Sequence, residues 1–309
     1  MTAPLGEAGD ATEALRRRAF AIGYRMLGSV AEAEDVVQEA LLRLHRAGEG
    51  IESPIAFVST VATRLAIDHL RSARVRREQY VGEWLPEPLV EDPDGDPAQR
   101  AEMVESLSVA FLAVLERLSP EQRAVLLLRD VFGYGFDEIA EILERKEPSV
   151  RQLAVRARRH VREERPRFAV SRQRHERLAA TFFGALERGD LPALEAILAE
   201  DVVLHGDGGG KAPALATAVS GRDRIGRTLL AWAALGHRIG GSLRPAVVNG
   251  GPGALVLDAD ARLIAVWAFQ VTDDRITGIS SIVNPDKLRH LGEVGNLTDA
   301  LRAAARART

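Results

Sequence analysis

The chain of 309 residues contains no cysteine and has almost no excess of either charge, with 41 basic against 44 acidic side chains. Without cysteine, disulfides, thiolate metal sites and thiol nucleophiles are excluded. A net charge of −3 argues against a uniformly basic nucleic-acid binder. No apolar run approaches the roughly 18 residues of a membrane span, and residues 1–10 lack a signal-peptide pattern. We therefore expect a cytoplasmic protein with no membrane partner.

The near-neutral total conceals a division of charge along the chain. Residues 55–80 carry five arginines against two acidic residues, and residues 148–167 carry seven against two, for net charges of +3 and +5. Between them, residues 81–103 carry seven acidic residues, one arginine and four prolines, a net charge of −6. Such a linker is either merely solvated or lies on basic surfaces that would otherwise bind nucleic acid.

Hydrophobic periodicity divides the chain in the same way. Up to about residue 168 the pattern is helical, with helices predicted at residues 11–26, 35–44, 56–70, 103–118 and 120–130. Ser119, Pro120 and Gln122 form the signature of a capping box at the start of the last of these. After residue 173 the pattern predicts helices at 175–188, 191–198 and 222–235, and strands at 201–205, 253–257, 263–271 and 276–283. This order favours an α+β domain built on a curved antiparallel sheet.

A helix-turn-helix is the clearest sign of DNA binding. Residues 136–143 and 148–161 are typical of two short helices joined by a four-residue turn. Val150, Leu153, Ala154 and Ala157 have the spacing of a packed face. The side chains predicted to meet DNA lie off that face and are Arg151, Gln152, Val155, Arg156 and Arg159. Arginine and glutamine can read guanine and adenine edges in the major groove, and further arginines can bind phosphates.

Three segments, in order, resemble the extracytoplasmic-function sigma factors of bacterial RNA polymerase. AEDVVQEALLRL (residues 33–44) resembles their core-polymerase-binding helix, and PIAFVSTVATRLAIDHLR (residues 54–71) resembles their promoter-melting helix, which reads the minus-ten element. LSPEQRAVLLLR (residues 118–129) and the helix-turn-helix resemble their minus-35-reading domain. The resemblance implies an alternative sigma factor that binds core RNA polymerase and directs it to promoter DNA.

The resemblance also implies roles for particular residues. Core polymerase would contact an exposed stripe of Asp35, Gln38, Glu39 and Leu42. The first basic block would bind DNA phosphates through Arg64, Arg71, Arg74, Arg76 and Arg77. The loop at residues 46–54 lies where the family captures an unstacked base.

The sequence departs from the family pattern at a few positions. Arg64 stands where the family often has Asn, and Phe57 where it often has Trp. In the helix-turn-helix, Glu144 and Pro148 replace usual glycines, and Leu153 replaces a usual arginine. The promoter sequence that is read therefore does not follow from the resemblance.

The chain continues well past the helix-turn-helix, and residues 175–291 resemble a SnoaL-like domain of the NTF2 fold. Three motifs match sigma factors that carry this fused domain: WLPEP, DGGGK and NPDKL. Their residues are Trp84, Leu85, Pro86, Glu87 and Pro88; Asp207, Gly208, Gly209, Gly210 and Lys211; and Asn284, Pro285, Asp286, Lys287 and Leu288. A Trp followed closely by two prolines is a stiff apolar anchor. The resemblance implies that it docks on the C-terminal domain or its junction with the sigma domains, and that this domain regulates the sigma domains in cis.

The predicted architecture is multidomain, with two all-α sigma domains followed by an α+β NTF2-like cone. Its parts are a region 2 domain (11–80), the acidic linker (81–104), a region 4 helix-turn-helix domain (105–168), the SnoaL-like domain (173–292) and a tail (293–309), which is either helical or frayed. We predict no catalytic residue, metal or cofactor.

Two other functions remain open at this point. The first is a ligand-sensing transcription factor that acts without core polymerase. The second is a SnoaL-type enzyme tethered to a DNA-binding module, with His205, Asp207, His237 and Arg238 as candidate groups in the cone. A small-molecule ligand in the cone, the inducing signal, the direction of regulation and the oligomeric state also stay open.

Overall fold

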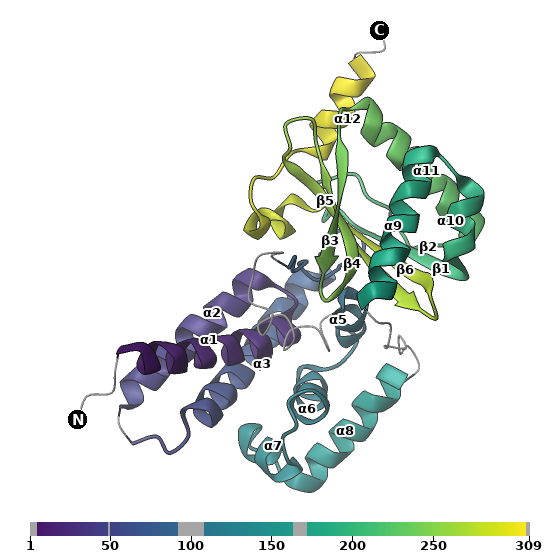
Figure 1. Cartoon of the computed structure of the whole chain (residues 1–309). Helices are drawn as coiled ribbons and strands as arrows, with labels where there is room; N and C mark the ends of the chain where they lie inside the picture. The colour runs from purple at the N-terminus through teal and green to yellow at the C-terminus, as the bar shows by residue number, and fades with distance from the viewer. Residues whose placement is uncertain (1–4, 49, 92–107, 163–171, 307–309) are drawn as a thin grey trace. The chain divides into compact units, whose positions relative to one another are not determined.

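The computed structural model describes residues 5–48, 50–91, 108–162 and 172–306, and the chain forms two compact units. Unit 1 contains Met1–Glu78 and Val114–Arg165, and unit 2 contains Gln79–Ala113 and Pro166–Thr309. The two helical regions thus share one unit, whereas the segment after residue 78 belongs with the C-terminal domain. The predicted domain boundaries stay predictions. Figure 1 labels the elements.

Three long helices form the first half of unit 1. They are α1 (Leu5–Leu27), α2 (Val30–Ala47) and α3 (Pro54–Glu78). The side chain of Ser29 caps α2 by accepting a hydrogen bond from the backbone N–H of Glu32, at 3.3 Å. Val36, Val37 and Ala40 of α2 are buried at helical spacing, which leaves the opposite face of that helix outward.

The second half of unit 1 contains the helix-turn-helix. Its helices are α6 (Pro120–Asp130), α7 (Phe136–Ile142) and α8 (Glu147–Arg162). The capping box at the start of α6 is confirmed, with Gln122 N to Ser119 Oγ at 3.2 Å and Ser119 N to Gln122 Oε1 at 3.0 Å. Ile139, Val150 and Ala154 are buried between α7 and α8, as the spacing predicts.

One predicted helix is shorter than expected. The pattern predicts a helix over residues 103–118, but α5 covers only Val109–Leu115. Arg117 N and Leu118 N bond to the carbonyls of Val114 and Leu115, three residues back, so the chain leaves the α-helix there. Residues 103–107 lie outside the described residues.

Unit 2 is built on a six-stranded sheet of order β2-β1-β6-β5-β4-β3. The strands are β1 (Leu198–Asp207), β2 (Val219–Ser220), β3 (Ser242–Val248), β4 (Gly251–Leu257), β5 (Leu263–Thr272) and β6 (Arg275–Ile282). The expectation of a wholly antiparallel sheet is wrong, because β1 pairs with β6 in parallel. The long connection from β1 to β6, through four strands and a helix, permits this pairing, which a tight hairpin would forbid.

The strand β3 was absent from the sequence prediction because Pro245 interrupts its pattern. Proline removes a backbone donor and is confined to edge strands. Here β3 is the edge of the sheet, where one side of its backbone needs no partner within the sheet.

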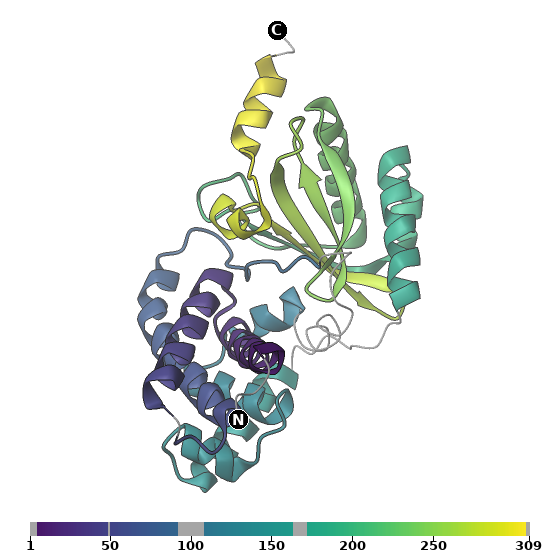
Figure 2. The same ribbon diagram turned by 60° about the vertical axis from the view of Figure 1, so that its left-hand side comes forward.

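The two faces of the sheet bury different groups. Helices α9 (Arg172–Arg188), α10 (Leu191–Ile197) and α11 (Arg222–Arg238) lie over one face, as Figures 1 and 2 show. Phe182 lies there with its ring centroid 4.7 Å from that of Phe269. The opposite face buries Val266 and Ile282 together with Leu85, which comes from the segment after α3.

The chain then ends in short elements. Two 3-10 turns, η1 (Pro285–Lys287) and η2 (Arg289–Leu291), follow β6, and α12 (Leu297–Arg306) shows that the tail contains a helix. None of the helices in the described part of the chain is long and apolar enough to span a membrane.

Phe182→Ala should destabilise unit 2 by about 3–5 kcal/mol, because it leaves a cavity at a fully buried site. All three tryptophans belong to unit 2, so denaturant unfolding followed by tryptophan fluorescence reports on it. Glu187→Ala, at an exposed position of α9, serves as the control and should leave the midpoint nearly unchanged. Equal midpoints for both variants would contradict the assignment of Phe182 to the core.

Candidate promoter-binding surfaces and linker site

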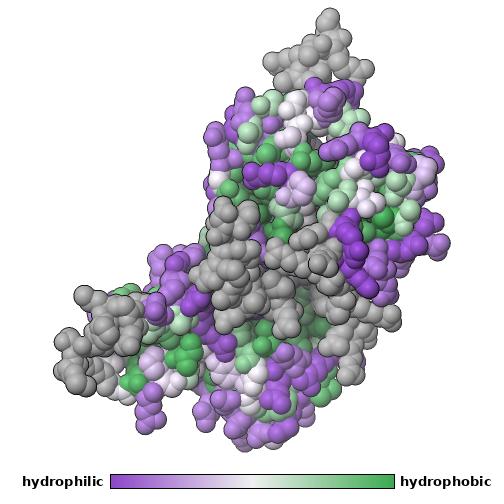
Figure 3. All heavy atoms as spheres, in the orientation of Figure 1, coloured by the Kyte–Doolittle hydropathy of each residue, from purple (hydrophilic) through white to green (hydrophobic). Residues whose placement is uncertain are grey.

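The predicted DNA-reading side chains of α8 lie together on its outer face. Arg151, Gln152, Val155, Arg156 and Arg159 are all exposed, and Val155 is 67% exposed although it is apolar. In the space-filling view hydrophilic side chains gather over α8 (Figure 3). An exposed aliphatic group among arginines suits a major groove, where thymine presents a methyl group.

Two arginines of α8 are fixed within unit 1. Arg151 Nε donates to Glu147 Oε1 at 2.8 Å, and its guanidinium lies 4.5 Å from the ring centroid of Phe136. Arg158 pairs with Asp130 of α6, with Nε 3.0 Å from Oδ2. The side chains of Gln152, Arg156 and Arg159 make no hydrogen bond or ion pair with another described residue. They are therefore the most available for DNA.

The predicted polymerase-binding stripe lies on the outer face of α2. Asp35 and Gln38 are exposed, Leu42 is 41% exposed, and Glu39 binds Arg43 at 2.6 Å within the same helix. These positions lie opposite the buried face, so the stripe is open to a partner.

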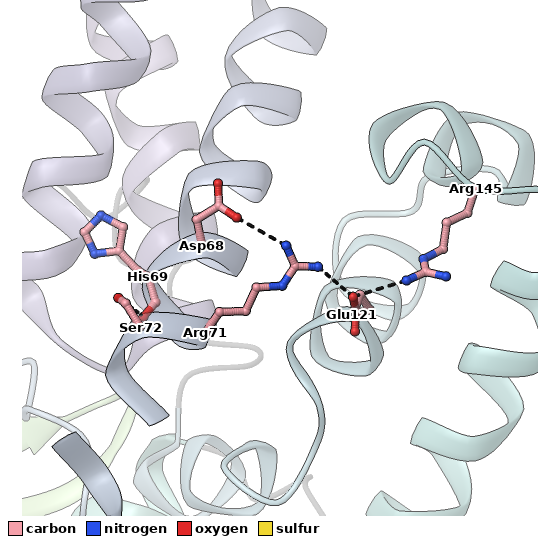
Figure 4. Close-up of polar contacts among 6 residues, drawn as sticks. All are labelled: Asp68, His69, Arg71, Ser72, Glu121 and Arg145. Atoms are coloured by element: carbon pink, nitrogen blue, oxygen red, sulfur yellow. Dashed lines mark hydrogen bonds and ion pairs between the residues drawn. The ribbon is translucent and has the colours of Figure 1, made fainter. Parts of the chain in front are cut away.

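The basic helix α3 contacts the helix-turn-helix through Arg64. Its Nε donates to the carbonyl of Ile142 at 2.8 Å and its Nη2 to that of Glu141 at 3.1 Å, while Nη1 pairs with Glu144 Oε1 at 2.8 Å. Arg71 pairs with Glu121 of α6 at 2.8 Å, and Glu121 also binds Arg145 (Figure 4). The side chains of Arg74, Arg76 and Arg77 lie outside the described residues.

Further contacts join the two halves of unit 1. The guanidinium of Arg18 lies 4.3 Å and that of Arg25 lies 5.0 Å from the ring centroid of Phe132, which follows α6. Arg123 of α6 is buried and donates to the carbonyl of Met26 at 2.5 Å and to Glu116 at 2.7 Å. Stacked and buried arginines of this kind are held more firmly than exposed ion pairs.

Unit 2 brings the three sequence motifs together around Asp207, which is completely buried. Its carboxylate accepts hydrogen bonds from the Tyr80 hydroxyl (2.5 Å), from Leu85 N (2.8 Å) and from Lys287 Nζ (2.7 Å). Lys287 also donates to the carbonyl of Leu85, and Asn284 Nδ2 donates to Tyr80 Oη at 2.8 Å. The carboxylate therefore joins strand β1, the NPDKL motif and the linker segment, which we define as residues 79–91.

The ammonium group of Lys287 also contacts aromatic rings of the linker segment. It lies 4.2 Å from the Trp84 ring centroid and 4.9 Å from that of Tyr80. Because Lys287 is 6% exposed, these cation–π contacts are desolvated, where they are strongest. The anchor expected at Trp84 thus holds a buried charge as well as apolar surface.

The glycines of DGGGK form a tight turn against the linker segment. Gly209 and Gly210 have φ of 56° and 71°, a left-handed conformation that favours glycine. A Cβ at Gly209 would lie 2.9 Å from Tyr80 Oη, and one at Gly210 would lie 3.1 Å from Val81 Cβ. Glycine is therefore required here for close packing.

The remainder of the linker segment lies along unit 2. Leu85 is 2% exposed in the apolar face of the sheet, and Val90 forms an antiparallel bridge with Val248 of the edge strand β3. His205 Nδ1 lies 2.7 Å from Glu83 Oε1, and His290 Nε2 lies 2.8 Å from the Pro88 carbonyl. The other motif residues are placed as follows: Pro86 and Leu288 are buried, Glu87 and Pro285 are half-buried, and Lys211 pairs with Asp286.

Comparison with known proteins assigns the two halves of unit 1. Residues 12–76 match the model "Sigma-70 region 2" and residues 108–161 match "Sigma-70, region 4". The ECF RNA polymerase sigma factor SigJ of Mycobacterium tuberculosis is 38% identical over 89% of this chain and 91% of its own. The probable ECF RNA polymerase sigma factor SigI of the same species is 33% identical over 86% of this chain and 90% of its own.

The chain belongs to the extracytoplasmic-function (ECF) RNA polymerase sigma factor family. The crystal structure of M. tuberculosis SigJ superposes with a TM-score of 0.74 and 36% identity, over 91% of this sigma factor and 98% of that chain. The protein thus acts in transcription initiation with core RNA polymerase and promoter DNA, and its C-terminal domain has the expected α+β architecture, which it shares with SigJ. Region 2 comprises α1–α3, and region 4 contains the helix-turn-helix.

The family is not enzymatic, and the geometry of the candidate catalytic groups agrees. His205 and Asp207 alternate along β1 with Val202 and Leu204, which pack under the helices. They therefore face the linker segment, away from the interior of the cone. His237 is exposed at the end of α11, so the structure does not bring these groups together in the cone.

Several residues in these sites were missed by the sequence prediction. Tyr80, Glu83, Asn249 and His290 hold the linker segment, and Glu121 holds Arg71. No sequence motif contains both one of these residues and the residue that it binds. The contacts between the linker segment and the sheet join positions more than a hundred residues apart in sequence. Only the polar, aromatic character of Tyr80 beside the linker could have suggested a role.

Arg159→Ala should weaken binding of the polymerase-bound protein to its promoter about tenfold and reduce the salt dependence by about one phosphate contact. DNA titrations of the holoenzyme at several salt concentrations measure both quantities. Arg177→Ala removes an exposed arginine of α9 and serves as the matched control. Identical salt slopes for the two variants would remove Arg159 from the DNA-binding surface.

Raising the pH should release the linker segment through Tyr80. Burial, followed by the hydrogen bond to Asp207 and its negative charge, raises the pKa of the Tyr80 phenol. Because the bound phenol is neutral, its contribution to docking is complete below the unfolded pKa of about 10 and is lost as pH rises above it. Comparison of tyrosinate absorbance in the wild type and in Tyr80→Phe should show one tyrosine ionising late. A difference titration with an ordinary midpoint would contradict this.

Proposed function

We propose that the C-terminal domain controls this sigma factor in cis by holding the segment that joins regions 2 and 4. The single observation that carries the proposal is the completely buried carboxylate of Asp207, which accepts hydrogen bonds from two linker groups and from Lys287. A buried carboxylate that loses its hydrogen-bond donors pays a large desolvation cost. The arrangement in which the linker segment supplies those donors is therefore strongly favoured over one in which Asp207 stays buried without them.

The geometry of a promoter explains why holding the linker matters. The minus-ten and minus-35 elements lie about 25 base pairs apart, or roughly 85 Å along B-form DNA. A fully extended chain over residues 79–108 could reach on the order of 100 Å. With Leu85 and Val109 in one apolar cluster on the sheet, this reach is lost. Docking of the linker therefore favours an inactive state, and release permits regions 2 and 4 to bind the two elements.

The proposal also covers the cellular location of the protein and the question of a small-molecule ligand. Binding of core polymerase and promoter DNA supports a cytoplasmic location. The face of the sheet beneath the helices is lined by aromatic and aliphatic side chains, including Phe182, Trp232 and Trp267. A small-molecule partner therefore has no specific observation in its favour, and control by conformation or by a protein partner is the preferred form.

Lys287→Met should raise transcription several-fold. It removes a buried cation from beside Asp207, and breaking a buried pair costs about 3–5 kcal/mol. The measurement is transcription in vitro with core RNA polymerase on a promoter that the full-length protein selects from genomic fragments. Trp84→Ala, which removes the ring over Lys287, should act in the same direction.

Arg224→Met is the control, because it removes an exposed positive charge from α11 of the same unit. Limited proteolysis of the linker and the melting of unit 2 separate release of the linker from unfolding. Cleavage that increases without any change in transcription would overturn cis control by the docked linker. A chain ending at residue 168 that starts no transcription with core polymerase, under conditions where the full protein does, would overturn the inhibitory direction.

A further inference from the structure

Two departures from the family pattern lie in contact with each other. Arg64 stands where the family often has Asn, and Glu144 where it usually has Gly, and their side chains pair at 2.8 Å. Arg64 also donates to the last carbonyls of α7, those of Glu141 and Ile142. Arginine at a helix C-terminus satisfies carbonyls that the helix leaves open. One residue of region 2 therefore closes the first helix of the helix-turn-helix in region 4.

Glu144 occupies a position that costs conformational energy. Its φ is 52°, in the left-handed region that glycine tolerates and a side chain with a Cβ does not favour. A glycine there would be the less strained residue. The carboxylate is thus gained at the expense of local backbone strain, and the described contact that it makes is with Arg64.

A second carboxylate of region 4, that of Glu121, also forms an ion pair with an arginine of the basic helix α3. Glu121 of α6 lies between Arg71 of α3 and Arg145 of region 4, at 2.8 and 3.3 Å (Figure 4). Burial would raise the pKa of Glu121, but the hydrogen bond and charge of Arg71, followed by a backbone hydrogen bond and the charge of Arg145, lower it. Glu121 is therefore ionised and acts as a fixed anion on the region 2 surface.

We propose that Glu144 and Glu121 act as intramolecular substitutes for DNA phosphates at Arg64 and Arg71. The described phosphate-binding arginines of α3 then have two alternative anionic partners, region 4 of the same chain and the backbone of the opened promoter strand. Arginine binds carboxylate and phosphate with the same planar fork, which makes such an exchange chemically direct. This inference assumes that Arg64 and Arg71 bind DNA and does not depend on control by the linker.

The exchange has a measurable consequence. A polyanion should separate region 2 from region 4 by competing for the two arginines, and removing the carboxylates should lower the polyanion concentration that is required. Both ion pairs are partly exposed, with Arg64 and Arg71 side chains 44% and 57% accessible, so DNA can approach them. The remaining contacts between the two regions, at Phe132 and Arg123, determine how far regions 2 and 4 separate in the absence of DNA.

The absence of native cysteine makes the experiment direct. In the full-length protein, Ala31→Cys and His160→Cys place spin labels at exposed sites of α2 and α8. Pulsed electron paramagnetic resonance then measures the distance between regions 2 and 4 during titration with a single-stranded oligonucleotide of mixed sequence. We expect the combined variant Glu121→Gln, Glu144→Gly to open at an oligonucleotide concentration about 3- to 10-fold lower than the unmodified background.

Glu141→Gln is the matched control, since it removes a neighbouring exposed carboxylate whose backbone, and not its side chain, binds Arg64. It should titrate like the background. Equal midpoints for the combined variant and this control would overturn the proposal, as would opening that the oligonucleotide does not promote in any variant. If the linker segment does not control the protein, the transcription assays fail but this distance titration is unaffected. Failure of the proposed function and failure of this inference are therefore distinguishable.

Discussion

The buried pair of Asp207 and Lys287 is the constraint on which the docking of the linker segment on unit 2 depends. A carboxylate with no exposed surface is tolerated only when its lone pairs are satisfied, and here a lysine, a phenol and a backbone amide satisfy them. Two of those donors belong to the linker segment, so the hydrogen bonds of Asp207 are satisfied only when the linker segment is docked on the sheet. The parallel pairing of β1 with β6 brings the end of β1 beside the NPDKL motif, where Lys287 can reach Asp207.

Unit 1 follows a related principle with weaker interactions. Region 2 and region 4 meet through arginines that stack on Phe132, bind carbonyls or pair with carboxylates. Such contacts are individually modest when exposed and are sensitive to competing anions. The two proposals together assign two kinds of control to this protein. The buried contacts of the linker segment would act through conformation, and the exchangeable ion pairs between regions 2 and 4 would respond to the nucleic acid itself.

Local signals in the sequence predicted local structure well. The capping box at Ser119, the helix-turn-helix spacing and the outward set on α8 depend on interactions within a few residues, and each is found where expected. Errors arose where tertiary context outweighs local preference. Pro245 concealed β3 because an edge strand tolerates a missing donor, and the parallel β1–β6 pair cannot be inferred from period-two alternation, which is the same in both pairings.

Sequence by itself determined the family, the two basic blocks, the acidic linker and the three motifs, because residue identity and spacing carry that information. It could not determine which distant residue each of these functional residues binds. Tyr80 with Asp207, and Arg64 with Glu144, are pairs whose members are separated by 127 and 80 positions in sequence, and no local pattern links them. Only the folded chain brings them within hydrogen-bond distance, since chain topology, and not residue preference, decides which polar groups lose water together.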